Sequence, residues 1–184
     1  MKNYQNKLWI ITIALFLLSF INIAFMSLGI ICFIIPFVQY LKYKEQIWCQ
    51  YFCPRAGFFT KLFKNIGLKK QLPKWLRGGK LKEIVLYYFI INLTFIAMSS
   101  VMVLLGRISP IEELRILIVI GTSLKVPQLV PLELPPVLLH FSYRMLSVMF
   151  TSISIGSILG FVYAPRTWCI ICPVMTLTKK KIRT

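Results

Sequence analysis

The cysteines are the residues of this sequence whose type and spacing could do chemistry. Four of the five form two pairs, Cys49 with Cys53 and Cys169 with Cys172. Four thiolates supply every protein ligand that one [4Fe–4S] or [2Fe–2S] cluster needs. Zinc also binds four cysteines, and a CxxC pair by itself can be a thiol redox site. The pairs therefore predict one shared iron–sulphur cluster, with zinc and thiol–disulphide chemistry as alternatives.

The residues that flank the two pairs are of matching types. They are Trp48, Pro54 and Arg55 around the first pair, and Arg166, Trp168 and Pro173 around the second. A proline has a fixed φ and no N–H, so each proline is expected to turn the chain away from the ligands and stiffen the loop. The tryptophans are expected to shield the site and anchor it at headgroup depth. The arginines are expected to offset the negative charge of a thiolate-ligated cluster.

Three other residues limit which further sites the chain can hold. Cys32 lies inside an apolar run and is expected to be a small buried hydrophobic residue, not a ligand. His140 is the only histidine, which excludes a bis-histidine haem within this chain. Arg144, at the start of another apolar run, is interpreted as an interfacial anchor and not as a functional charge within the membrane. The sequence also lacks a glycine-rich dinucleotide fingerprint after a predicted strand.

The composition indicates that lipid is the solvent of this protein. Hydrophobic residues make up 58% of the 184 residues and the mean hydropathy is +0.75, whereas soluble domains contain roughly 45–50% apolar residues. The formal net charge of +17 comes from 22 Lys and Arg against 5 acidic residues. These bases fall in short clusters between apolar runs, which suits membrane topology and argues against nucleic acid as a partner.

Three apolar regions without charged residues, 8–41, 84–105 and 145–164, predict the membrane spans. The second and third each match the roughly 20 residues that cross a bilayer. The first is too long for one span, so we expect a helical hairpin with its turn at Met26–Gly29; one long tilted helix is the alternative. The predicted fold is therefore an all-α membrane protein of four transmembrane helices, arranged as two hairpins.

This fold is expected to form a single membrane domain over residues 1–184. Residues 1–54 hold the first hairpin and the first cysteine pair, 55–82 a cytoplasmic connection, and 83–184 the second hairpin and the second pair. Apolar residues at helical spacing, with lysines between them, predict an interfacial amphipathic helix in the connection. The two similar motifs, WCQYFCP and WCIICP, suggest a parallel two-fold internal repeat.

The distribution of basic residues predicts the orientation in the cytoplasmic membrane. Only Arg107, Arg115, Lys125 and Arg144 lie towards the proposed outer side, which leaves eighteen of the 22 bases on the inner side. This imbalance places both termini in the cytoplasm. Because two spans separate the cysteine pairs, both pairs lie on that same reducing side, where structural disulphides are rare.

At WCQYFCPRAGFF and APRTWCIICPVMTLT the sequence resembles the membrane-bound 4Fe–4S binding proteins related to the nitrous-oxide and periplasmic nitrate reductase accessory proteins. The resemblance implies that Cys49, Cys53, Cys169 and Cys172 bind a cluster, with 4Fe–4S preferred over 2Fe–2S. It also implies electron transfer in quinone-linked or respiratory chains. Larger members carry an additional ferredoxin domain and a flavin-binding extracytoplasmic domain, and this sequence shows neither. The resemblance therefore implies a minimal membrane module.

The expected function is one-electron transfer at the cytoplasmic surface, as a subunit or partner of a larger redox assembly. A soluble ferredoxin or flavodoxin could be attracted by the basic inner side as a donor, and a quinone or another membrane redox subunit could continue the path. Those bases could equally serve only to set topology and bind anionic lipid. The alternative function is a structural or assembly subunit stapled by a redox-silent metal such as zinc; a small transporter ranks last.

Overall fold

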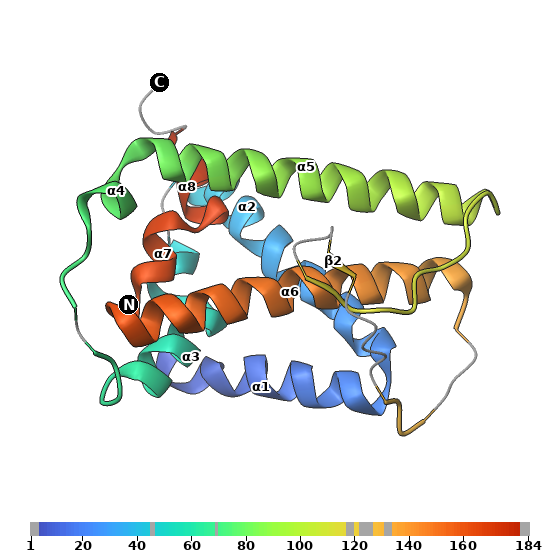
Figure 1. Ribbon diagram of the computed structural model, residues 1–184, viewed down its shortest axis with the longest axis horizontal. Coiled ribbons are helices and arrows are strands. Elements are labelled where there is room, and N and C mark those ends of the chain that lie inside the picture. Colours follow the sequence, from blue (N-terminus) through green and yellow to red (C-terminus); the bar gives the residue numbers. More distant parts are fainter. Residues whose placement is uncertain are drawn as a thin grey trace. The chain divides into compact units, whose positions relative to one another are not determined.

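The computed structural model describes residues 4–44, 47–68, 70–116, 120–121, 127–130 and 134–180 (Figure 1). Lys125 on the predicted outer side lies outside the described residues, as do Lys2, Lys69, Lys181 and Arg183 on the predicted inner side. The described chain is mostly helical. Its elements are α1 (Gln5–Ile21), the 3₁₀ helix η1 (Ile23–Ile30), α2 (Ile31–Tyr43), the π-helical turn η2 (Trp48–Phe52), α3 (Pro54–Phe63), α4 (Lys74–Arg77), α5 (Gly79–Leu104), β1 (Arg115–Ile116), β2 (Ile120–Gly121), α6 (Pro136–Val162), α7 (Thr167–Ile171) and α8 (Pro173–Lys180).

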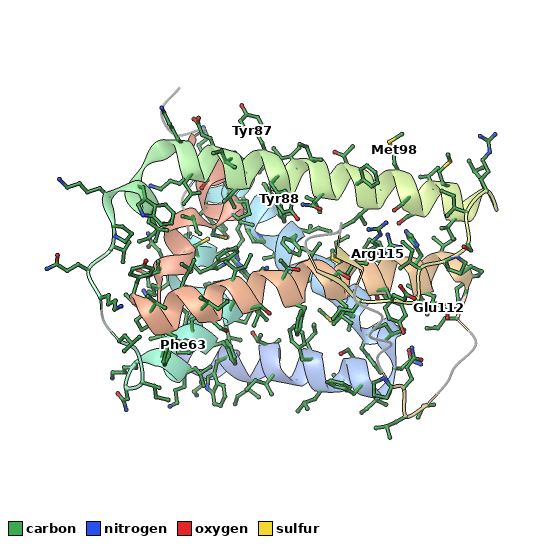
Figure 2. The ribbon with its side chains drawn as sticks, viewed as in Figure 1. Phe63, Tyr87, Tyr88, Met98, Glu112 and Arg115 are labelled. Carbon is green, nitrogen blue, oxygen red and sulfur yellow. The ribbon has the colours of Figure 1, made fainter. Side chains whose placement is uncertain are left out.

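Three helical segments are long and apolar enough to cross a membrane. They are Ile23–Tyr43 with 21 residues, Gly79–Leu104 with 26 and Pro136–Val162 with 27. At 1.5 Å per residue, α5 is about 39 Å long, more than the roughly 30 Å hydrocarbon core. Its outer surface carries large apolar side chains, among them Tyr87 at 58% exposure and Met98 at 68% (Figure 2). These features are those of an all-α membrane protein.

The first apolar region is broken, but not at the predicted turn. Met26–Gly29 lies inside η1, so that prediction is wrong; α1 instead ends at Ile21 and the chain turns at Asn22. The Asn22 Oδ1 accepts the Ala24 N–H at 2.8 Å, and the N–H groups of Leu129 and Val130 donate to the last carbonyls of α1. An asparagine that binds nearby backbone in this way stabilises a turn.

The two ends of this first region meet again, as a hairpin requires. The Gln5 Nε2, at the start of α1, donates to the Cys49 carbonyl at 3.0 Å, beyond the end of α2. α1 is apolar from Lys7 to Ile21 but is shorter than the three segments that satisfy the length for a span.

Contacts divide the chain into two compact units. The first comprises Met1–Thr12, Ile31–Phe89 and Ile153–Thr184, and the second comprises Ile13–Ile30 and Ile90–Ser152. The first unit contains both cysteine pairs. The second contains the Asn22 turn and the antiparallel pairing of β1 with β2, in which Arg115 faces Gly121.

Within the first unit, α3 packs against the C-terminal half of α6. Gly156 and Gly160, one turn apart on α6, leave room for the rings of Phe59 and Phe63, also one turn apart on α3. A side chain at Gly156 would overlap the Phe59 ring, which is fully buried. The helix predicted after the first cysteine pair is therefore present, but part of its apolar face packs on protein.

Candidate metal centre

The first cysteine motif forms one wide turn that ends at an extended residue. The Cys53 N–H donates to the Trp48 carbonyl at 2.8 Å, a bond that spans five residues and makes the turn π-helical. Cys53 itself is extended, with φ −62° and ψ 113°, and Pro54 begins α3. A residue before proline avoids the helical region, and proline suits the first position of a helix. Pro54 thus separates two helical segments, as its predicted role in stiffening the loop requires.

The second motif has the same plan with one residue fewer. Cys169 lies in α7, Cys172 is extended with φ −57° and ψ 127°, and Pro173 begins α8. Two residues separate these cysteines, and the turn that carries them is α-helical; three separate the first pair, and their turn is π-helical. The wider turn absorbs the additional residue. Both motifs consequently place their cysteines about one turn apart, with the distal cysteine directly before a new helix.

The thiols of the two motifs lie within electrostatic range of one another. All four are half-buried and none forms a disulphide. Burial raises the pKa of Cys49 to about 12, and the neighbouring Cys53, Cys172 and Cys169 add to the shift. Burial, with Cys53 and Cys172, likewise raises the pKa of Cys169 to about 12. Residues that are far apart in sequence are thus brought within electrostatic range, where a cation would favour their deprotonated form.

Arg55 and Arg166 both lie within electrostatic range of these thiols. Burial raises the pKa of Cys172, and Arg55 opposes that rise. Arg55 also lowers the pKa of Cys49, and both Arg166 and Arg55 lower that of Cys169. The Arg55 guanidinium lies 5.1 Å from the centre of the Phe33 ring, a cation–π distance. Two positive charges therefore lie where thiolates would gather negative charge.

Gln5 is a residue of this site that the sequence reasoning missed. Its Nε2 donates to the carbonyls of Cys49 and Gln50 at 3.0 and 2.9 Å, and its Oε1 accepts from Arg166 Nη2 at 2.7 Å. Only 2% of Gln5 is exposed. This one side chain links the backbone of the first motif to the arginine that precedes the second. Its place three residues before the first apolar run is the only signal for it in the sequence.

The tryptophans differ in their surroundings. Trp168 is 9% exposed and packs in an apolar cluster with Phe59, Phe63 and Ile171. Its Nε1 is buried and has no hydrogen-bond partner within the described part of the chain. This burial suits the predicted shielding of the site, whereas a headgroup anchor would present its N–H to water. Trp48 is half-buried and stacks on Phe52, with ring centres 6.2 Å apart.

Cys32 lies closer to the site than the sequence suggested. It is half-buried near the start of α2, within electrostatic range of Cys53 and Arg55. In both motifs the second cysteine stands directly before a helix that begins with proline. Cys32 instead lies inside α2, so it does not belong to the repeated motif.

Over the described residues, no group of three or more His, Cys, Asp or Glu side chains could hold a metal ion as placed. A single zinc ion with tetrahedral bonds of about 2.3 Å would need sulphurs about 3.8 Å apart. The four cysteines of a [4Fe–4S] cluster each bind a different iron, so their sulphurs lie farther apart than those around one ion. Four cysteines match the number and type of protein ligands that one such cluster needs.

Comparisons with known proteins found no matching family model, no matching curated protein and no matching solved structure.

Proposed function

We propose that this chain is a membrane electron-transfer protein in which Cys49, Cys53, Cys169 and Cys172 hold one iron–sulphur cluster, 4Fe–4S in preference to 2Fe–2S. One observation carries the proposal: the fold joins two similar motifs that are remote in sequence, because Gln5 donates to the Cys49 and Gln50 carbonyls and accepts from Arg166, which precedes the second pair. The four cysteines are free and form no disulphide. A cluster needs four such thiols as ligands. The resemblance to the membrane-bound 4Fe–4S binding proteins supports the same assignment.

Each part of the chain has a separate task in this proposal. A bound cluster supplies reversible one-electron transfer. The four thiolates bind it, and Arg55 and Arg166 offset their negative charge. Trp168 and its apolar neighbours exclude water from the second motif. Gln5 holds the backbone of the first motif in place through two carbonyls, which keeps the ligand positions fixed when the charge changes.

The proposed topology has four spans, namely α1, the η1–α2 segment, α5 and α6. The excess of bases on one side supports cytoplasmic termini and cytoplasmic cysteine pairs. The shared plan of the motifs, with an extended cysteine before a proline-started helix, supports a parallel internal repeat. The exposed Leu62 supports interfacial contact by the remaining apolar face of α3.

A cluster at one face cannot alone carry electrons across a hydrocarbon core of about 30 Å. We therefore propose that the protein is a subunit or partner of a respiratory or quinone-linked assembly. A quinone or another redox subunit continues the path. The basic cytoplasmic side suits an acidic soluble donor such as a ferredoxin or flavodoxin, whose reduction rate would then fall as salt rises.

The experiment that tests the proposal is metal analysis of anaerobically purified full-length protein. We expect about four irons and four acid-labile sulphides per chain, as the composition of a [4Fe–4S] cluster requires. Dithionite reduction should produce a paramagnetic signal. A Cys32→Ser variant is the matched control and should retain both the iron and the signal.

Stoichiometric zinc without a signal would contradict electron transfer and favour a structural staple. Protein that binds neither metal after anaerobic reconstitution with iron and sulphide would contradict both.

A further inference from the structure

Arg144 is a buried charge that the cysteine site does not use. It lies on α6, in the second unit, and only 5% of its surface is exposed. Its Nε and Nη1 are buried and find no hydrogen-bond partner among the described residues. An interfacial anchor would extend its guanidinium into the headgroup region, so this burial disagrees with the interpretation of Arg144 as an anchor. A buried ionised side chain in a membrane helix needs a partner.

A second arginine is held beside the first. The backbone N–H of Arg115, on β1, donates to the Ser147 Oγ at 3.1 Å, and Ser147 lies one turn after Arg144 on α6. The two guanidinium groups lie within electrostatic range of each other. The Arg115 Nε is also buried and has no partner within the described ranges. Figure 2 shows Arg115 alongside α6. The fold thus brings two like charges together instead of separating them.

The described neighbours of the two arginines add donors but little negative charge. The His140 Nδ1 accepts the Ile111 N–H at 3.2 Å, so its proton lies on Nε2, which faces the Ser99 Oγ at 2.9 Å. This histidine is therefore neutral and engaged. The buried Ser142 Oγ has no partner in the described part of the chain. Glu112 lies within electrostatic range of Tyr143 but is exposed.

From this arrangement we propose that Arg144 and Arg115 bind an oxyanion, the phosphate group of an anionic phospholipid or free phosphate. The buried Arg144 and the half-buried Arg115 hold three buried nitrogens without a partner in the described part of the chain, and they require negative charge as well as acceptors. A phosphate supplies both, and guanidinium groups bind it with paired hydrogen bonds. A quinone carbonyl would accept hydrogen bonds but would leave the charges uncompensated. Lipid is the richer source, since α6 is a helix that suits a membrane.

The proposal is tested by the thermal unfolding of the purified full-length chain in a non-ionic detergent. Phosphatidylglycerol, phosphatidylcholine, a neutral quinone or sodium phosphate is added at constant ionic strength. We expect phosphatidylglycerol to raise Tm by on the order of 5 °C at a concentration about 100 times its Kd. Arg144→Gln and Arg115→Gln should remove this rise. Arg115→Gln keeps the backbone N–H that binds Ser147, so it tests the charge without removing that contact.

The matched control is Arg107→Gln, an exposed arginine in the same unit that should leave the rise intact. A response to sodium phosphate alone, lost in the same two variants, would support the site and identify free phosphate as its ligand. An equal rise in Tm in all variants would overturn the proposal. So would an unsubstituted chain whose Tm rises with neither phosphatidylglycerol nor sodium phosphate. Stabilisation by the neutral quinone alone would overturn the oxyanion assignment.

Discussion

The two cysteine motifs reach one plan from different spacings and with different support. The first has three residues between its cysteines and forms a π-helical turn; the second has two and forms an α-helical turn. The first is held by hydrogen bonds from Gln5, whereas the second is held by an apolar cluster around Trp168. Both motifs therefore share the geometry around the second cysteine and the proline after it. The number of residues between the two cysteines differs with the type of helical turn that carries them.

Changing the number of residues between the cysteines should have the largest effect on iron binding. The effect should be larger in the second motif than in the first. An alanine inserted between Ile170 and Ile171 must widen α7, whose Trp168 and Ile171 are buried in the apolar cluster. We expect this variant to lose its iron. Deletion of Gln50 converts the first motif to the spacing of the second, in a turn that contains no buried residue, and should retain most of its iron. Iron content per chain measures both; equal losses would refute the shared plan.

The apolar support of the second motif should be sensitive to volume. Phe59→Ala leaves a cavity and should lower the free energy of unfolding by about 3–5 kcal/mol. Gly156→Ala forces a methyl group into the Phe59 ring and should lower it by about 1–3 kcal/mol. Gly79→Ala, where nothing lies within 4 Å, is the matched control. Unfolding in detergent measures the series, and a harmless Gly156→Ala would contradict this packing.

The polar support of the first motif should be weaker but specific. Gln5→Leu keeps the approximate volume but removes both donors to the carbonyls of Cys49 and Gln50. Leaving such buried groups unpaired costs about 1–3 kcal/mol. We expect a fall in unfolding free energy of that order, together with faster loss of iron to a chelator. Gln71→Leu, at an exposed glutamine, should change neither; a Gln5 variant that behaves like it would remove Gln5 from the site.

The smallest expected effect is electrostatic. Arg166 is exposed, so solvent weakens its action on the Cys169 thiol. A reduced cluster carries one more negative charge, so loss of a nearby positive charge should lower the midpoint potential, here by roughly 10–40 mV in Arg166→Gln. Arg166→Lys should recover part of this shift. A redox titration monitored by paramagnetic resonance measures it, and an unchanged potential in Arg166→Gln would argue against the role.

The sequence predicted the elements that depend on local pattern. Long uncharged runs identified α5 and α6 as helices that suit a membrane, because lipid demands continuous apolar length. The cysteine and proline spacing identified both motifs. The middle of the first apolar region predicts its turn at Met26–Gly29, whereas Gly29 is a packing residue: a Cβ added there would lie 3.0 Å from the Met149 Cε. Asn22 makes the turn through hydrogen bonds.

The residues that sequence reasoning missed depend on contacts between distant segments. Gln5 joins residues 44 to 161 positions away, and no local pattern distinguishes it from any other polar residue near the N-terminus. The position of Arg144 at the start of an apolar run predicts an interfacial anchor. Its 5% exposure appears only in the folded chain, where β1 also bonds to Ser147 on α6. The spacing of apolar residues along a helix predicts which face of that helix is apolar. It does not predict which other segment of the chain packs on that face.

The central claim is that the two motifs hold one cluster together. It is tested most directly by iron per chain in two double variants, Cys49→Ser with Cys53→Ser and Cys169→Ser with Cys172→Ser, after anaerobic reconstitution. Because a shared cluster needs ligands from both motifs, we expect each double variant to lose all the iron that the unsubstituted protein binds. Retention of half the iron in each variant would show that each motif holds its own metal and would contradict the account.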